Sequence, residues 1–324
     1  MGWSTHATGT QDPPEVRNWR IHLVAFVASM SALAMGYDTS VIGGTMALEA
    51  FRRDFGLAGA SAHHRDNAGC FFGALLTFPF AERYGRRFTV MAASAVFLVG
   101  ATLMTAANGT MNMVIAGRAV AGLGIGLVVP VYISETAPPS IRGRLIGIFE
   151  IASQGGGMLV GYPLALQLVP GILLCVGMFF CPESPRWLAR GDNFDKAEKV
   201  ISTLRNLPAD HPYVRNEMNE IRIQVEERST NKMSKKQQVQ KLFQKGVRNR
   251  MGIGLALMFL QSFTGVNIIT YYAPRIFESL GVPGTSLKLF STSFYGISKT
   301  LGMITFTIVV VETVGRRKGF SVFS

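Results

Sequence analysis

Two oppositely charged residues, Asp38 and Arg118, lie within long apolar stretches of the sequence. An isolated charge in the hydrocarbon layer of a membrane costs at least about 2.5 kcal/mol, so such a residue persists mainly where it is paired or functional. Because the two charges have opposite signs, we expect them to form an ion pair. A purely structural pair is one interpretation of this pattern.

Amide side chains also occur within apolar stretches, at Gln154, Gln261 and Asn267. An amide both donates and accepts hydrogen bonds. It can join two helices, which is worth about 0.6 kcal/mol on average, or bind an uncharged hydroxylated compound in a watery cavity. Asn267 follows Gln261 by six residues and Tyr271 comes a further turn on. We therefore expect these three side chains to approach one helical face.

Acidic and basic residues occur together at the ends of the apolar stretches. Opposite charges at helix ends can form ion pairs between helices that hold one conformation and break when the parts rock. Anchoring of the helix ends would explain the basic residues but not the acids beside them. The candidate gating residues are Glu82, Arg86, Arg87, Glu135, Arg142, Glu183, Arg186, Glu312, Arg316 and Arg317.

Covalent chemistry finds no support in the sequence. The apolar stretches contain no nucleophile with a neighbouring base and no cluster of metal ligands, so we expect no enzyme, no metal and no cofactor. Three cysteines, Cys70, Cys175 and Cys181, lie in apolar segments and indicate neither disulfides nor a zinc site.

The elements that position these residues are predicted from composition and length. The chain has 324 residues, of which 48% are hydrophobic and 16% are charged, whereas a soluble domain carries about 25% charged residues. About 20 apolar residues form a helix that crosses a hydrocarbon core of about 30 Å. The sequence therefore predicts an all-α polytopic membrane protein with spans at Ile21–Leu48, a segment ending near Ala81, Phe88–Ala107, Met113–Ile133, Leu145–Tyr162, Pro163–Cys181, Met251–Tyr272 and Leu287–Val311.

The basic residues predict the orientation of these spans. The net charge is +12, which in a soluble protein would suggest a nucleic-acid partner. Here 25 of the 32 basic residues fall on the side of the N-terminus and of the polar loop 182–250. Since basic residues collect in cytoplasmic loops, we expect the N-terminus and this loop in the cytoplasm. This orientation explains the positive charge without a nucleic-acid partner, so we expect none. We expect a multi-pass protein of the plasma membrane.

Two spans are shorter than a membrane helix requires. Only 14 uncharged residues, 68–81, are available for the second span, and the fifth and sixth spans share 37 residues, 145–181. Two full spans with a loop need about 42 residues. We expect internal deletions at both places.

A repeated motif indicates the internal symmetry and leads to a family resemblance. The pattern E-x-x-G-R-R occurs at residues 82–87 and again at 312–317, which suggests two parallel six-helix units joined by the loop. In order and spacing, the motifs of the chain resemble those of the sugar porter family of the major facilitator superfamily, especially its fungal members for hexoses, pentoses or quinate. The matching segments are 36–39, 42–44, 85–87, 117–118, 130–143, 182–187, 261–272 and 315–317.

The resemblance implies a domain organisation. A cytoplasmic tail (1–20) would precede an N-terminal six-helix bundle (21–181), a cytoplasmic helical loop domain (182–250) and the first two helices of a second bundle (251–324). Members of the family have twelve helices, so we expect a chain truncated after the eighth. The missing helices would ordinarily form half of the cavity.

The resemblance also implies transport of a sugar, a hexose or pentose, by alternating access, with membrane lipid around the helices. A carrier of quinate or a polyol, a sugar sensor and a non-transporting fragment remain alternatives. Asp38 with Arg118 would couple transport to a proton, although proton-independent members also keep the acid. The implied substrate-binding residues are Gln261, Asn267, Tyr271, Gln154 and Glu150. Ser262 and Glu150 depart from glutamines usual in the family, which leaves substrate choice open.

Overall fold

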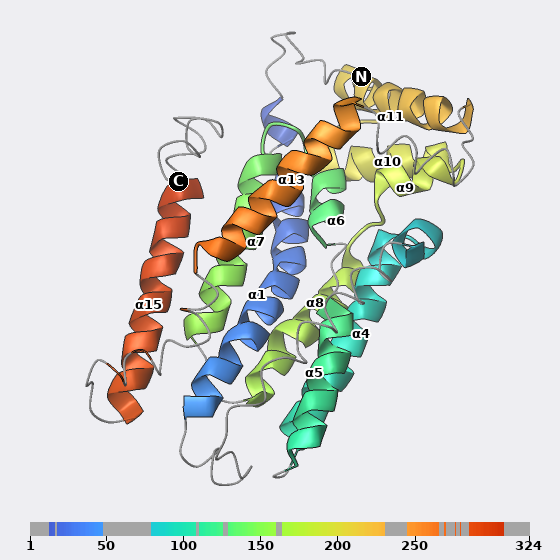
Figure 1. The fold of residues 1–324 in the computed structure, drawn as a ribbon. Helices are drawn as coiled ribbons and strands as arrows, with labels where there is room; N and C mark the ends of the chain where they lie inside the picture. Colours follow the sequence, from blue (N-terminus) through green and yellow to red (C-terminus); the bar gives the residue numbers. More distant parts are fainter. Residues whose placement is uncertain are drawn as a thin grey trace.

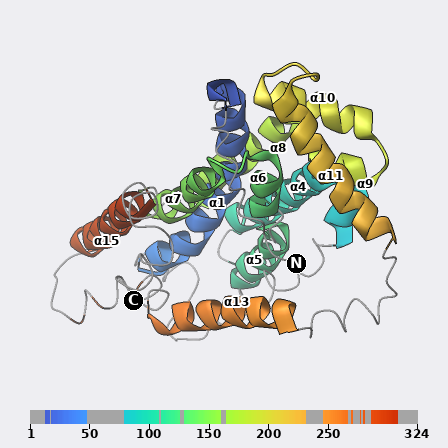
Figure 2. The ribbon, with the colours of Figure 1, turned by 90° about the horizontal axis from the view of Figure 1, so that it is seen from above.

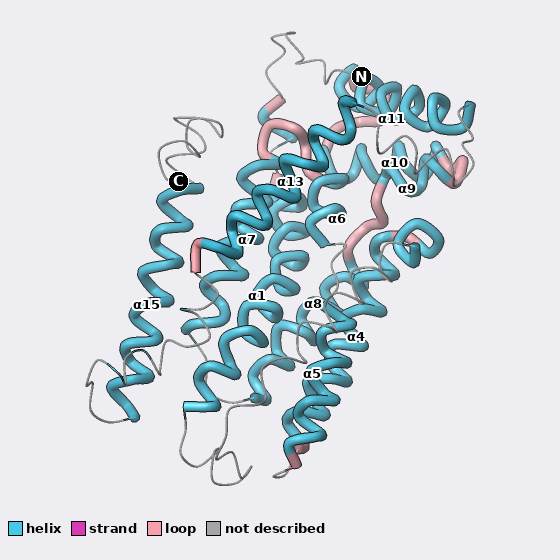
Figure 3. Tube along the Cα trace, in the orientation of Figure 1, coloured by secondary structure: helices cyan, strands magenta, loops and turns pink. Residues whose placement is uncertain are grey.

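A computed structural model describes residues 13–16, 18–47, 79–107, 110–125, 129–159, 164–230, 245–265 and 285–307, together with residues 269, 276 and 279. Over these residues every regular element is a helix (Figure 3). The predicted all-α class is confirmed. The second predicted span is described only at its end, where residues 79–84 are helical, and the second E-x-x-G-R-R motif lies outside the described residues.

Six helices form the main bundle (Figure 1). They are α1 (Trp19–Ala47), α4 (Arg86–Thr105), α5 (Met111–Ile125), α6 (Val129–Thr136), α7 (Arg142–Leu159) and α8 (Leu168–Phe180), the last preceded by a short 3-10 helix (Leu164–Gln167). Three stretches are apolar and long enough to cross a membrane: Trp19–Thr39, Arg86–Thr105 and Asn112–Thr136, of which the last includes residues 126–128 between α5 and α6, outside the described part of the chain. With 13 residues, α8 is about 20 Å long, shorter than the hydrocarbon core.

The helices of the bundle are held together by close packing. Ala28, Tyr132, Leu145 and Met178 belong to one buried cluster that joins α1, α6, α7 and α8. Between α4 and α5 the approach is so close that a Cβ added at Gly100 would collide with the backbone of Ala121. The outer face of α8 is apolar and exposed, as expected for contact with lipid, at Val169, Ile172, Leu173, Val176 and Phe180.

A separate cluster of three helices lies at one end of the bundle (Figure 1). It consists of α9 (Pro185–Arg190), α10 (Phe194–Arg205) and α11 (Pro212–Thr230). These helices are amphipathic and share their own core, which includes Ala189, Ala197, Ile201, Val214 and Met218. The cluster is attached to the bundle through Asn18, which accepts from the first amides of α1 and donates to the Leu204 carbonyl at 2.8 Å.

The last two described helices differ in how they pack. Helix α15 (Thr285–Thr305) lies against α7, with Thr300 next to Gly155 and Thr307 next to Gly147. In contrast, the side chains of α13 (Lys245–Phe263) are exposed from residue 246 to its end, and Figure 2 shows this helix apart from the bundle.

The predicted continuous span Met251–Tyr272 is wrong. Helix α13 ends at Phe263, and Gly265 adopts a left-handed φ of 74°. Glycine takes this conformation without steric cost, so it commonly follows the end of a helix. Gln261 is therefore not on one unbroken helix with positions 267 and 271, which lie outside the described residues.

Candidate functional site

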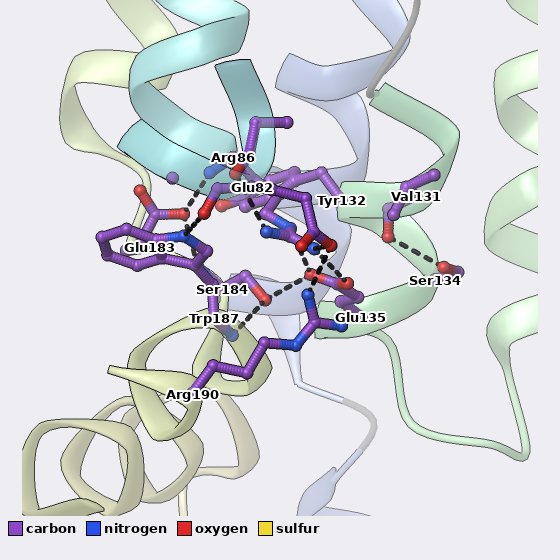
Figure 4. Close-up of polar contacts among 12 residues, drawn as sticks. Glu82, Arg86, Val131, Tyr132, Ser134, Glu135, Glu183, Ser184, Trp187 and Arg190 are labelled. Atoms are coloured by element: carbon purple, nitrogen blue, oxygen red, sulfur yellow. Dashed lines mark hydrogen bonds and ion pairs between the residues drawn. The ribbon is translucent and has the colours of Figure 1, made fainter. Parts of the chain in front are cut away.

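The first candidate site is a buried ion pair where α4 begins and α6 ends. Arg86 Nε donates to Glu135 Oε2 at 3.1 Å, and Arg86 Nη2 donates to Glu135 Oε1 at 3.3 Å (Figure 4). Ser184 Oγ donates to the same carboxylate at 2.5 Å, and Arg86 Nη1 donates to the Ala81 carbonyl at 2.9 Å. Both charged side chains are buried. The two-point geometry is the strong form of an arginine–carboxylate contact.

Glu183 caps the N-terminus of α4. Its carboxylate accepts from the backbone amides of Arg86 at 2.9 Å and of Arg87 at 3.0 Å. These amides have no partner within the helix, and the helix dipole favours a negative charge at this end. Gly85 has a φ of 96°, and a Cβ there would collide with Glu183 Oε2. The glycine of the first E-x-x-G-R-R motif therefore leaves room for the cap.

Arg87 and Glu82 bind other elements. Arg87 Nε donates to the Met178 carbonyl at 3.1 Å, at the C-terminal end of α8, where unpaired carbonyls favour a cation. Glu82 forms ion pairs with Arg190 of α9 at 2.8 Å and with Arg86 at 3.9 Å. We call Glu82, Arg86, Arg87, Glu135 and Glu183 the charged end. The structure brings these five predicted gating residues together.

Two other predicted gating residues, Arg142 and Arg186, do not form ion pairs within the described part of the chain. Arg142 donates to the Ala137 carbonyl at 3.2 Å. Burial lowers the pKa of Arg142, and the nearby Arg186 and Arg205 lower it further. Two of these like charges are bound by neighbouring carbonyls at the end of α6, Arg142 by Ala137 and Arg205 by Thr136. The remaining three, Glu312, Arg316 and Arg317, lie outside the described residues.

One buried arginine was missed by the sequence analysis. Arg205, at the end of α10, binds both oxygens of Glu217 at 2.9 and 2.6 Å and donates to the Thr136 carbonyl at the end of α6 at 2.9 Å. Only 1% of its surface is exposed. In the sequence it is one of 15 basic residues in a polar loop, and nothing distinguishes it from the others.

The second candidate site is the predicted pair inside the bundle. Arg118 of α5 and Asp38 of α1 are both buried, and Arg118 Nη1 lies 3.7 Å from Asp38 Oδ1. Arg118 Nη1 also donates to the Asp38 backbone carbonyl at 3.4 Å. The expected pairing is confirmed. Its charged atoms are farther apart than in a charge-assisted hydrogen bond, which measures about 2.7–2.9 Å.

The predicted substrate-binding residues are not gathered in one place by the described structure. Glu150 and Gln154 lie one turn apart on α7, and both are half-buried. Gln261 is exposed on α13. The described residues supply no helix against that face of α13. Asn267 and Tyr271 fall outside the described residues.

The chain is similar to curated proteins from fungi. It is 38% identical to a protein named probable quinate permease from Aspergillus clavatus, 37% to its namesake from Aspergillus fumigatus and 35% to the quinate permease of Emericella nidulans. Each match covers 94% of this chain and 63% of the relative, so the chain spans less than two thirds of their length.

These matches also bear on the two short spans. For the Aspergillus fumigatus protein, 94% of the 324 residues, or about 305, align over 345 positions. About 40 aligned positions therefore have no residue in this chain. This number does not place the gaps along the chain, so the internal deletions at residues 68–81 and 145–181 stay a prediction.

Solved structures agree on the fold. The proton:xylose symporter XylE bound to 6-bromo-6-deoxy-D-glucose is 23% identical, with a TM-score of 0.76 over 90% of this chain and 70% of XylE. A partially occluded inward-open form of XylE from E. coli has a TM-score of 0.70 at 23% identity, over 89% of this chain and 74% of that one. At this identity the likeness establishes the fold.

A family model described as sugar (and other) transporter matches residues 24–323, which is nearly the whole chain. This is a family of transporters and not of enzymes. The predicted resemblance is thereby confirmed: the chain belongs to the sugar porter family of the major facilitator superfamily.

Proposed function

We propose that the complete protein carries a small polyhydroxylated compound across a membrane by alternating access. We further propose quinate as the substrate, in preference to the neutral hexose or pentose expected from the sequence. The observation that carries this choice is the 35–38% identity to quinate permeases over 94% of the chain. Quinate is a hydroxylated ring with a carboxylate, so it needs both amides and a cation in its binding site.

The charged end serves as a gate in this proposal. Arg86 and Glu135 hold the start of α4 to the end of α6, and Glu183 adds the chain segment that leads to α9. A cluster of buried, hydrogen-bonded charges has few intermediate arrangements, because a half-broken pair leaves a charge unpaired. Such a cluster favours two discrete states, as alternating access requires.

The pair Asp38–Arg118 is the proton-coupling site in this proposal. Its separation of 3.7 Å supports this role, since protonation of a loosely held carboxylate releases the arginine at a smaller cost in hydrogen bonds. The binding residues would be Gln154 and Glu150 from α7 with Gln261, Asn267 and Tyr271 from the second bundle.

We also propose the domain division at residues 20, 181 and 250 and the orientation predicted from the basic residues. The N-terminus, the charged end and the helices α9 to α11 then face the cytoplasm. The exposed apolar face of α8 supports immersion of the bundle in lipid.

Uptake measurements test the proposal. The complete protein is expressed in yeast cells that lack uptake of quinate and of hexoses, and uptake of radiolabelled quinate, xylose and glucose is measured against cells with an empty vector. We expect saturable quinate uptake. Saturable uptake of xylose or glucose without quinate uptake would contradict quinate as the substrate and indicate a neutral sugar. The amide of Gln154 within α7 could bind the hydroxyl groups of such a sugar.

A further inference from the structure

Lys299 is a basic residue in the middle of a predicted membrane span. It occupies the midpoint of the predicted span Leu287–Val311 and lies within helix α15. Within the described parts of the predicted spans, away from the first turns, the lysine and arginine residues are Arg118 and Lys299. A charged side chain at this depth is costly and by default marks a functional site.

The side chain of Lys299 is on the inner face of α15. Gly296, Thr300, Met303 and Thr307 follow at helical spacing along the buried or half-buried side, and Lys299 itself is half-buried. The opposite side is exposed, for example at Leu301. Since Thr300 and Thr307 pack on α7, Lys299 is directed toward the interior of the molecule and away from lipid.

No described residue neutralises this charge. Lys299 has no hydrogen-bond or ion-pair partner in the described part of the chain. The contact of Thr300 with Gly155 places Lys299 at the level of Gly155 on α7. Glu150 lies five residues before Gly155 on α7, which is about 8 Å along the helix axis. The other basic residue, Arg118, is bound to Asp38.

We propose that Lys299 binds the carboxylate of the transported compound and thereby selects polyhydroxylated carboxylates over neutral sugars. This inference rests on the proposed function, because it assigns the residue that recognises the charged group of the substrate. An ammonium that is partly shielded from bulk water forms a strong, charge-assisted contact with a carboxylate. A neutral sugar would leave the same ammonium without a partner, which costs binding free energy. The site therefore favours a carboxylate both through the contact that it forms and through the penalty on a neutral compound.

The test compares two variants of the complete protein, Lys299→Met and Lys299→Arg, by the KM for quinate and the half-inhibiting concentration of its neutral methyl ester. We expect Lys299→Met to raise the KM for quinate about 10- to 100-fold while inhibition by the ester changes less than about threefold. Lys299→Arg keeps the charge and should retain most of the preference for quinate. Lys288→Met, which removes the same charge from the first turn of α15, is the matched control and should behave like the unaltered protein.

The outcomes separate this inference from the proposed function. If the unaltered protein takes up no quinate, the proposed function fails and this inference fails with it. If the unaltered protein takes up quinate and Lys299→Met does so with the same KM, the inference alone is overturned. Loss of both quinate uptake and ester inhibition in Lys299→Met and Lys299→Arg, with normal amounts of protein in the membrane, would assign Lys299 a structural role and also overturn it.

Discussion

Two buried ion pairs among the described residues, Arg86–Glu135 and Arg118–Asp38, are built differently. At the charged end, Arg86 binds Glu135 at two points, at 3.1 and 3.3 Å, and Ser184 donates to the same carboxylate. In the middle of the bundle, the charged atoms of Arg118 and Asp38 are 3.7 Å apart. Removal from water penalises both pairs, and the short two-point contact of the first offsets more of this penalty than the 3.7 Å contact of the second. The first pair joins α4 to α6 through short contacts, and under the proposed function the second pair changes its charge during transport.

The largest effect should follow from breaking the charged end. Arg86→Met leaves the Glu135 carboxylate buried without its cation, and we expect a loss of about 3–5 kcal/mol in the free energy of unfolding. The measurement is thermal unfolding in detergent together with the amount of protein in the membrane. The double variant Arg86→Met with Glu135→Leu should recover much of the loss. A single variant as stable as the unaltered protein would show that the pair does not hold α4 to α6.

The next largest effect is expected at Arg205, which resembles Arg86 in burial and two-point binding but joins the short helices to the bundle. Arg205→Met leaves Glu217 and the Thr136 carbonyl without their donor, at a cost of about 2–3 kcal/mol. Glu217 is partly exposed, so water replaces part of the lost contact and the effect stays below that of Arg86. Limited proteolysis should show faster cleavage within residues 185–230. Arg215→Met, which removes an exposed pair with Asp210, is the control and should leave cleavage unchanged.

A smaller loss of stability is expected from a substitution at Gly85, in the turn where Glu183 caps α4. Gly85→Ala places a side chain at a φ of 96° and against Glu183, and we expect a loss of about 1–3 kcal/mol. In the double variant with Glu183→Ala the collision disappears but the backbone strain remains, so its loss should be smaller than the sum of the two single losses. Strictly additive losses in thermal unfolding would contradict the contact between this turn and the cap.

The smallest effect on stability, together with a large effect on transport, is expected at the pair Asp38–Arg118. Asp38→Asn keeps the size of the side chain and should change the free energy of unfolding by less than about 1 kcal/mol, because the contact with Arg118 that it weakens is a long one of 3.7 Å. Under the proposed function, proton-driven accumulation of substrate should be lost while exchange of labelled for unlabelled substrate persists. Intact accumulation would leave the pair with a structural role only.

Much of the fold could be predicted from local sequence. The length and hydropathy of each apolar run predict α1, α4 and α7 to within a few residues, because a membrane helix satisfies its backbone within itself and needs no distant partner. The pairing of Asp38 with Arg118 was also predictable, since two opposite charges inside apolar spans have few other ways to be neutralised. The predicted continuous span over residues 251–272 was wrong, because hydropathy does not register the left-handed conformation that Gly265 adopts.

The sequence by itself determined the helices α1, α4 and α7, the places where charge accumulates and the family to which the chain belongs. Only the tertiary structure decided that Glu183 caps α4, that Arg87 binds the end of α8 and that Arg205 joins α10 and α11 to α6. These contacts join residues 69 to 97 positions apart in the chain. Composition and periodicity report the burial and the helical face of a residue, whereas its partner depends on how separate helices pack side by side.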